Sequence, residues 1–355
     1  MKPVDDLLED KGDITVSNVC VSVVIVNWNG KHHLTECLDS LFKQRFRDFE
    51  VIVVDNGSQD GSVEFMHNRY PAVRVIVLSE NKGYAGGNNA GLQEARGTFI
   101  VLLNNDTKVD PGWLESLVKT AHQEPLSGMW ASKILMYSDP GLIDNVGHLI
   151  YPDGLARGKG RLERDQGQYG QHEEALWPSG CAGMYRKEML DDIGGLDEDF
   201  FAYADDVDLG LRARLAGWKC TFVPDAVVFH KYSASSAAYS PLKAFLVERN
   251  RIWVLLKYYP LELIIISPFF TLLRLVVQFY GALAGKGAAG KFAQQYSAFS
   301  AIRILLKAWF FALVGLPRII KQRREFARKT RIGRDELYRL FKAFRISAFE
   351  IALKE

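Results

Sequence analysis

Carboxylate and amide side chains stand at the ends of several apolar segments in the first half of this chain. Asn27 ends one such segment, Asp55 ends the next, and Asn104-Asn105-Asp106 end another. Ligands of open α/β sheets bind at the carboxyl ends of the strands, so we expect these side chains to meet at one edge of a sheet. An anionic pocket on an apolar scaffold would suit a sugar nucleotide and a divalent metal ion.

A glycine-rich segment, residues 81–89, follows the third apolar run. Glycine lets backbone N–H groups approach a phosphate closely at a helix N-terminus, and Gly83 is the first glycine there. Lys82 either neutralises a phosphate or is a solvated loop lysine. The segment is a weak signal by itself, because it is not the G-x-G-x-x-G of nicotinamide-binding folds and does not follow the first strand. Asp55 alone has a local alternative too, since it precedes Asn56-Gly57 and can cap a turn.

The elements that must position these residues follow from hydrophobic periodicity. Strands are expected at residues 21–27, 49–54, 73–78 and 98–103, with helices near 34–42, 62–68 and 85–95 between them. This alternation predicts an α/β fold with a doubly wound, parallel sheet and right-handed crossovers. Beyond a helix that begins at Pro111 the pattern loosens. We expect strands at 128–135, 143–150, 177–181 and 226–230, helices at 186–193 and 205–216, and a mobile, glycine-rich loop at 151–176.

The combination of motifs resembles the inverting family 2 glycosyltransferases with the GT-A fold. The matching segments are VVDNGSQDGS (53–62), ENKGYAGGNN (80–89), LLNNDT (102–107), SGCAG (179–183), GGLDEDFF (194–201), DDVDLGLR (205–212) and GW (217–218). They occur in order between about residues 20 and 240. More narrowly, the chain looks like the bacterial rhamnosyltransferase-like branch that builds surface polysaccharide. The resemblance implies a mixed, mainly parallel sheet with helices on both faces.

The resemblance also implies a donor site. Asp55 would hold the nucleotide base or ribose, with Asn27 at the same end, and Gly57, Lys82, Gly83, Asn88 and Asn104 would complete the nucleotide-sugar contacts. Asp106 stands at the last carboxylate of the family's D-x-D motif and would bind Mg²⁺ or Mn²⁺ at the diphosphate. Asn104 occupies the first position of that motif without a charge, so the substrate would supply most metal ligands. His230 is either a further metal ligand or a structural histidine.

The acidic group at a predicted helix start matches the family's Glu-Asp pair, with Asp205 in place of Glu. Asp206 would be the general base that removes the proton from the acceptor hydroxyl. Repulsion among neighbouring carboxylates raises a carboxyl pKa, which suits a base near neutral pH. The alternative is helix capping, which we expect for Asp205. Asp208 and Arg212 are spaced to form an ion pair along the helix.

The acceptor would contact Trp177, Gly183 and Asp205. Trp177 and Trp218 are candidates for stacking on a sugar, with core packing as the alternative for both. The four cysteines have no C-x-x-C spacing and fit neither a zinc site nor a disulfide framework.

Charge divides the chain into regions. Residues 241–355 hold 21 Lys and Arg against 7 Asp and Glu, whereas residues 1–240 hold 23 against 35. We expect a flexible tail at 1–18 that is no secretory signal, a GT-A domain at 19–240, and a helical, basic, membrane-associating region at 241–355. Its apolar blocks, 252–283 and 298–316, favour helices in the membrane plane over a span, because the longest charge-free piece has only 11 residues. Basic residues downstream would attract anionic lipid.

These features predict a metal-dependent, inverting hexosyltransferase, peripheral on the cytoplasmic face of a bacterial membrane. Its donor would be a dTDP- or UDP-linked sugar, with rhamnose the candidate, and its acceptor a lipid-linked or growing glycan. One alternative is a catalytically silent sugar-nucleotide-binding or scaffold module of the same fold. Another assigns the basic region to nucleic acid, but its interleaved apolar blocks favour lipid. A glycoside hydrolase would leave the phosphate-binding features without a use.

Overall fold

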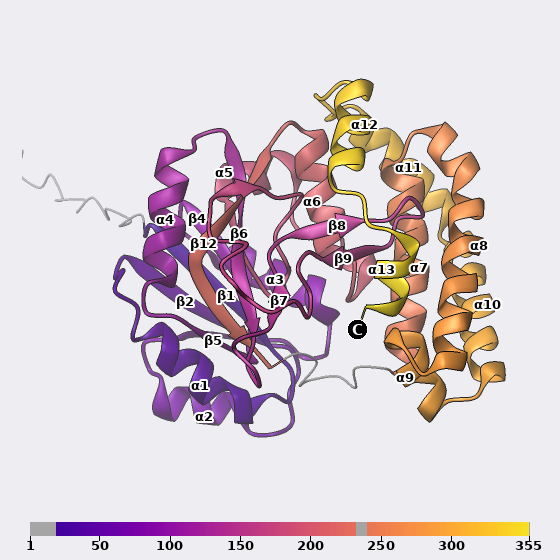
Figure 1. The fold of residues 1–355 in the computed structure, drawn as a ribbon. Helices are drawn as coiled ribbons and strands as arrows, with labels where there is room; N and C mark the ends of the chain where they lie inside the picture. The colour runs from indigo at the N-terminus through magenta and orange to yellow at the C-terminus, as the bar shows by residue number, and fades with distance from the viewer. Residues whose placement is uncertain (1–18, 232–239, 355) are drawn as a thin grey trace, which may run out of the picture.

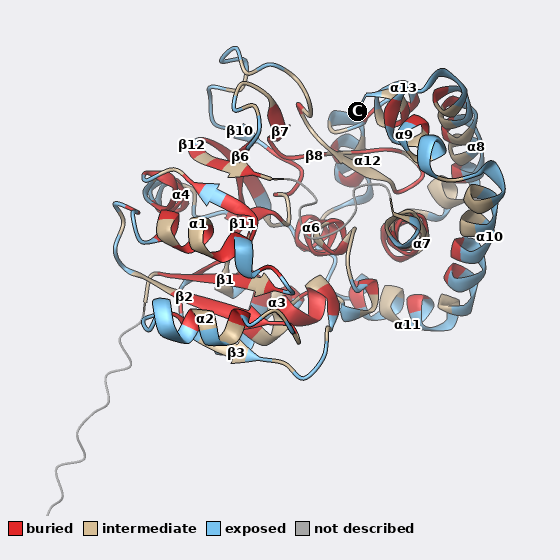
Figure 2. Cartoon of the chain, turned by 90° about the horizontal axis from the view of Figure 1, so that it is seen from below, coloured by how far each residue is buried: buried red, intermediate tan, exposed pale blue. Residues whose placement is uncertain are grey.

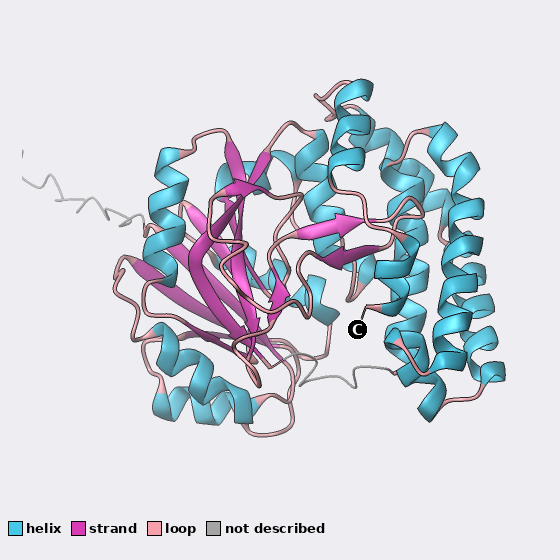
Figure 3. Cartoon of the chain, in the orientation of Figure 1, coloured by secondary structure: helices cyan, strands magenta, loops and turns pink. Residues whose placement is uncertain are grey.

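The computed structural model describes residues 19–231 and 240–354. The predicted tail at 1–18 therefore lies outside the described residues. A large sheet with flanking helices lies beside a group of helices from the second part of the chain (Figure 1, Figure 3). The ten strands of the sheet are β1 (Val21–Asn27), β2 (Phe49–Asp55), β3 (Arg74–Val77), β4 (Phe99–Asn104), β5 (Thr107–Val109), β6 (Ser127–Met136), β7 (Ile143–Asn145), β10 (Glu173–Glu174), β11 (Ala182–Arg186) and β12 (Lys219–His230).

The sheet is mixed and mostly parallel, as the sequence predicts. Its order is β10-β12-β6-β11-β4-β1-β2-β3, with β5 paired to β12 and β7 paired to β6. Strand β1 runs parallel to β2 and β4, β3 runs parallel to β2, and β11 is antiparallel to both β4 and β6. The carboxyl ends of β1, β2 and β4 therefore share one edge, which is where the predicted ligands stand.

Both faces of the sheet are covered, because its central strands are apolar on both sides. In β1, Val23 and Ile25 belong to one buried cluster and Val24 to the other. The helices of this part are α1 (Lys31–Leu41), α2 (Ser62–Arg69), α3 (Gly83–Glu94), α4 (Trp113–Gln123), α5 (Lys187–Ile193) and α6 (Asp205–Leu215), with a short 3₁₀ helix η1 (Glu198–Phe200).

Four predicted elements differ from the structure. The strand expected at 143–150 is two short strands, β7 and β8 (His148–Ile150), separated by Gly147 at φ +111°. No strand covers 177–181; the strand there is β11, which begins at Ala182. The last strand, β12, begins at Lys219 rather than 226 and includes register irregularities. The predicted loop 151–176 contains β9 (Ala156–Gly158), which pairs with β8, and the short strand β10.

The second part of the chain is helical. Its helices are α7 (Pro241–Tyr258), α8 (Leu261–Ala284), α9 (Gly287–Gln295), α10 (Ala298–Val314), α11 (Leu316–Ala327), α12 (Arg334–Ala343) and α13 (Ala348–Leu353). Helix α7 is the inner one: it packs against α6, α10 and α11, and Figure 2 shows it largely buried among its neighbours. Helices α8 and α10 lie on the side away from the sheet (Figure 1, Figure 2).

Helices α8 and α10 carry large exposed apolar side chains, including Phe269, Leu272 and Phe279 on α8 and Phe310 and Leu313 on α10. Among the helices of the described residues, α8 is the one that is long and apolar enough to cross a membrane, and the bent pair α9–α10 is a second candidate.

A buried ion cluster ties α8 to the rest of the protein. Arg274 of α8 contacts Asp153, in the turn between β8 and β9, and Glu248 of α7. Arg251 of α7 contacts the same two carboxylates. Residue 153 therefore belongs to an anchored turn, contrary to the mobile loop predicted there.

Candidate active site

The nucleotide end of the site begins with two neighbouring strand ends. Asn27 and Asp55 are register partners on β1 and β2, and the Asn27 Nδ2 donates to Asp55 Oδ2 at 3.2 Å. Asn105, just beyond β4, donates to Asn27 Oδ1 at 2.8 Å. All three side chains are buried. The second carboxylate oxygen of Asp55 accepts the backbone N–H of Ser58 at 2.9 Å, so the strand end and its turn form one unit.

Glycine is required at two positions beside this unit. Gly57 has φ +77°, and a Cβ there would lie 2.9 Å from the Glu80 backbone. Gly83 has φ +73°, and a Cβ there would lie 2.2 Å from the Phe201 carbonyl oxygen. Asn56 fixes the glycine-rich segment, because its amide donates to the Gly83 carbonyl and accepts the Lys82 N–H, both at 2.9 Å. Helix α3 thus begins at this sheet edge.

Two other predicted nucleotide-sugar residues make local contacts. The Asn88 amide donates to the Tyr84 carbonyl one turn back along α3, at 2.9 Å. Asn104 uses its backbone carbonyl, which accepts the Thr107 hydroxyl at 2.7 Å.

Asp106 lies against His230 at the end of β12. Asp106 Oδ1 is 3.3 Å from His230 Nε2, and His230 Nδ1 is 2.7 Å from Asp144 Oδ2. Arg161 pairs with the other oxygen of Asp144. Burial lowers the pKa of His230, but the Cys181 side chain and the Asp106 and Asp144 carboxylates outweigh it and raise the pKa well above its ordinary value.

The Asp106–His230 pair fits a divalent metal ion. With Nδ1 donating to Asp144, the usual arrangement for a metal-bound histidine, Nε2 faces the Asp106 carboxylate. Two ligand atoms about 2.1 Å from one cation and at right angles lie about 3 Å apart, close to the observed separation. Among the described residues, no group of three or more His, Cys, Asp or Glu side chains could hold a metal ion. The remaining ligands would have to be water and substrate phosphates.

The acidic helix start lies beside the loop before β11. Asp206 Oδ2 accepts the Gly180 N–H at 3.1 Å and lies 3.8 Å from His148 Nε2. Burial, followed by the Asp206 charge, raises the pKa of Asp205 well above its ordinary value. The predicted capping role of Asp205 is wrong: it is the first residue of α6, the cap position is Ala204, and no side chain caps the helix.

Contacts between neighbours connect the three predicted carboxylates. Asn27 contacts both Asp55 and Asn105, and Asn105 directly precedes Asp106 in the chain. His230 contacts both Asp106 and Asp144. Asn145, next to Asp144 in the chain, lies 3.5 Å from His148, which lies 3.8 Å from Asp206. Asn105 belongs to the strand-end group named in the sequence, whereas Asp144 and His148 had no signal there, because no motif joins them to the predicted carboxylates. The predicted pair of Asp208 with Arg212 is confirmed at 2.9 Å.

Two predicted acceptor residues lie in the interior instead. Trp177 is fully buried, stacks on His148, and fills the space that a Cβ at Gly210 would occupy. A ring packed in this way cannot stack on a sugar, so core packing replaces the predicted contact. Gly183 is buried inside β11, between β4 and β6.

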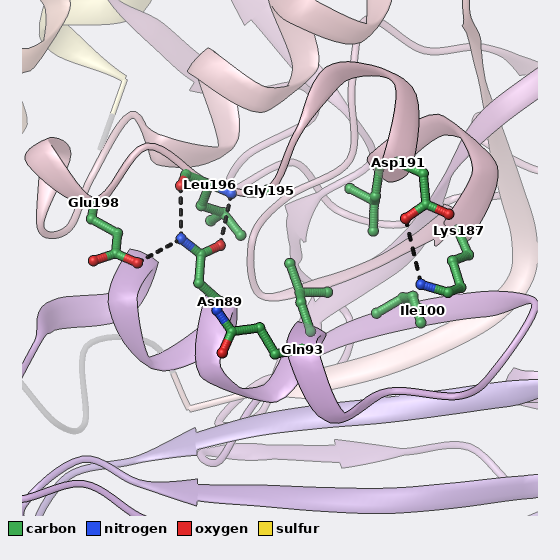
Figure 4. Close-up of a pocket in the computed structure, with 10 residues that line it drawn as sticks. Asn89, Gln93, Ile100, Lys187, Asp191, Gly195, Leu196 and Glu198 are labelled. Carbon is green, nitrogen blue, oxygen red and sulfur yellow. Dashed lines mark hydrogen bonds and ion pairs between the residues drawn. The ribbon is translucent and has the colours of Figure 1, made fainter.

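A pocket of about 430 Å³ between α3 and α5 is lined by none of the predicted site residues (Figure 4).

Comparisons with known proteins identify the family of this chain. The model of Glycosyl transferase family 2 matches residues 22–194. N-acetylglucosaminyl-diphospho-decaprenol L-rhamnosyltransferase of Mycobacterium tuberculosis is 30% identical over 267 residues, which are 65% of this chain and 85% of that protein. O-antigen biosynthesis protein RfbC of Myxococcus xanthus is 28% identical over 228 residues, 61% of this chain and 18% of that protein.

Solved structures show the same fold. TarS 1-349 of S. aureus in complex with UDP has a TM-score of 0.52 at 18% identity, covering 93% of this chain and 90% of that one. GalNAc-T7 with UDP, GalNAc and Mn²⁺ has a TM-score of 0.57 at 17% identity, covering 69% of this chain and 49% of that one. By its motifs, its GT-A fold and its rhamnosyltransferase relative, this chain belongs to glycosyl transferase family 2.

Proposed function

We propose that the protein transfers a sugar from a nucleotide diphosphate to an acceptor hydroxyl with inversion at the anomeric carbon. The observation that carries the proposal is the series of side-chain contacts and chain neighbours that links Asp55 through Asp106 to Asp206. A module that only binds nucleotide sugars needs no partly exposed carboxylate at the far end of that series, and Asp206 is such a group.

The donor lies along the shared strand edge. Asp55 and Asn27 bind the nucleoside, and Gly57 and Gly83 allow the backbone to approach it. Lys82 and the N-terminus of α3 face the diphosphate, where both favour negative charge. Asp106 and His230 would hold Mg²⁺ or Mn²⁺, and the bound ion would neutralise charge on the leaving diphosphate.

Asp206 is the general base. It accepts the proton of the acceptor hydroxyl as the oxygen attacks the anomeric carbon from the side opposite the leaving nucleotide. The Gly180 N–H on Oδ2 fixes the direction of the carboxylate. Asp205 is buried beside it, and its raised pKa favours the neutral form, which limits repulsion of Asp206.

The acceptor is a lipid-linked or growing glycan, and the sugar is rhamnose from a dTDP- or UDP-linked donor. The relative named as a rhamnosyltransferase of N-acetylglucosaminyl-diphospho-decaprenol supports both assignments. We assign residues 19–240 to transfer and 241–355 to membrane association. The exposed apolar side chains of α8 and α10 support docking on the cytoplasmic face, and the buried pairs of Arg274 support a helix held against the protein rather than a span.

The test is a transfer assay with the purified protein, dTDP-rhamnose or UDP-sugars, a polyprenyl-diphosphate-linked sugar, Mn²⁺ and vesicles. We expect a product whose anomeric configuration, measured by NMR, is opposite to that of the donor. Asp206→Asn should lose about 100-fold or more in turnover while donor binding stays intact. Asp225→Asn, at an exposed position, is the control. Retained configuration, or lost donor binding with turnover unchanged, would contradict the proposal.

A further inference from the structure

The loop that leads into Asp206 has an unusual backbone. Phe201, Tyr203 and Ala204 have φ values of 64°, 66° and 61°, in the left-handed region that side chains other than glycine rarely adopt. Three such residues within four positions do not keep this conformation by local preference. Strained segments of this kind persist only where surrounding contacts fix them. The contacts in this case come from α7, in the second part of the chain.

The side chain of Asn250, on α7, binds the backbone of this loop. Its side-chain nitrogen lies 3.1, 2.9 and 2.7 Å from the carbonyl oxygens of Phe200, Ala202 and Tyr203. The side chain is fully buried. Its oxygen accepts the Arg249 Nε–H at 2.9 Å, and this bond fixes which end of the amide faces the carbonyls.

Arg249 supports the same loop. Its terminal nitrogen donates to the carbonyls of Asp199 and Phe200, both at 3.1 Å, and its guanidinium lies 4.2 Å from the centre of the Trp253 ring. Burial lowers the pKa of Arg249 to about 10. Trp253 also packs edge-on against Phe200. One surface of α7 therefore contacts both the backbone and a side chain of the loop.

The loop connects the two ends of the proposed site. The Phe201 carbonyl accepts the Ala85 N–H at 3.3 Å, beside the glycine-rich segment. Its other end is Ala204, which directly precedes Asp205 and Asp206. Asn56 holds the glycine-rich segment independently, so a displaced loop would move the base more than the donor site.

We propose that Asn250 is a positioning residue: through the carbonyls of Phe200, Ala202 and Tyr203 it sets the place of the Asp206 carboxylate relative to the acceptor. The inference rests on the proposed role of Asp206. It makes α7 part of the catalytic apparatus as well as the start of the membrane-associating region. A displacement of about 1 Å in reacting groups can cost about 100-fold in rate, so a large effect on turnover is expected.

The experiment compares Asn250→Ala with wild type in full-length protein at a temperature where both are folded. The expected result is a fall of kcat by about 100-fold, with an unchanged Kd for the nucleoside diphosphate. Glu248→Gln is the matched control, because Glu248 is buried on the same helix but contacts Arg251, Arg274 and Trp309 instead of the loop. It should lose thermal stability and keep kcat.

Equal kcat losses in Asn250→Ala and Glu248→Gln at equal fractions folded would overturn the positioning role, as would an unchanged kcat in Asn250→Ala. Should that variant fail to fold, Arg249→Gln removes two of the loop contacts and is read in the same way. Hydrogen exchange of residues 200–206 gives a readout without turnover: faster exchange in Asn250→Ala than in Glu248→Gln is expected. If the wild-type protein transfers no sugar, the proposed function is wrong. The hydrogen-exchange measurement still tests whether Asn250 holds the loop in place.

Discussion

Each carboxylate of the proposed site is held by a different kind of neighbour. Asp55 accepts an amide N–H and a backbone N–H, Asp106 faces an imidazole nitrogen, and Asp206 accepts the backbone N–H of Gly180. Asp205 is buried, and its raised pKa favours the uncharged form. These environments support the three proposed tasks: binding a neutral ribose or base for Asp55, binding a cation for Asp106, and accepting a proton for Asp206.

A substitution of Asp144 tests whether His230 binds the metal ion, because Asp144 contacts His230 rather than the proposed cation. A carboxylate behind a metal-bound histidine typically contributes about 10–100-fold in metal affinity. Asp144→Asn should raise the Mn²⁺ concentration for half-maximal transfer by about that factor, with recovery of kcat at saturating Mn²⁺. Chelation should abolish transfer by wild type. A Mn²⁺ dependence identical to wild type would remove His230 from the metal site.

The sequence indicates candidate residues of the proposed site more readily than their contacts. Asp55, Asp106 and Asp206 could be proposed because each lies at or after the end of a strand or begins a helix within a recognisable motif. His148 was not among the predicted residues, because its partner, Asp206, lies 58 positions away and no motif joins the two. Trp177 was misassigned, since an indole at a strand end has the same sequence signal whether it faces the core or a cleft.

At the scale of elements, the cluster that joins α7, α8 and the β8–β9 turn has charges of both signs in the interior. Glu248 sits between Arg251 and Arg274, and Asp153 contacts both arginines. Removing one partner of a buried pair leaves an uncompensated charge, which costs about 3–5 kcal/mol. Glu248→Gln should lower the free energy of unfolding by about 3 kcal/mol in urea titration.

Glu325→Gln is the control for that measurement. Glu325 pairs with Lys321 on the exposed side of α11, where an ion pair contributes about 1 kcal/mol or less. Equal effects of the two substitutions on unfolding would show that the buried cluster does not hold α8 in place.

Glu248 also predicts a pH dependence. Burial opposes its charged form, but Arg251 and Arg274 outweigh burial and lower its pKa from 4.5 to about 2. Because the folded pKa lies below the unfolded one, this contribution to stability is complete above pH 4.5 and is lost as the pH falls toward 2. Unfolding measured between these values should show a shallower pH dependence in Glu248→Gln than in wild type; identical slopes would contradict the assignment.

Regular periodicity allowed the elements themselves to be predicted. The strands β1 to β4 follow continuous apolar, largely β-branched runs, and the helices between them, such as α1, follow apolar residues at helical spacing. Strand β1 has the predicted bounds. Prediction failed where tertiary contacts decide the structure. Asp153 is polar and lies in a glycine-rich segment, which reads as a loop in water, yet the arginines of α7 and α8 bury it completely. The contacts of α7 with η1 and α6 could not be predicted from the sequence either.

The whole molecule has one apolar outer side, formed by α8 and α10. Phe269 and Phe310 are about two thirds exposed there, and burying such a ring in lipid gains about 1.5–3 kcal/mol. Phe269→Glu and Phe310→Glu should each reduce flotation with anionic vesicles by about tenfold. Leu126→Glu, equally exposed before β6, should not. Undiminished flotation in both α8 and α10 variants would place the membrane contact elsewhere.

In the proposed function, one sheet edge of the molecule binds the whole donor. The decisive measurement is a crystal structure of the protein with a nucleoside diphosphate and Mn²⁺. We expect the nucleoside against Asp55 and Asn27, the cation between Asp106 and His230, and the terminal phosphate on the side of Asp206. A nucleotide bound instead in the pocket between α3 and α5, beside Asn89 and Lys187, would contradict it.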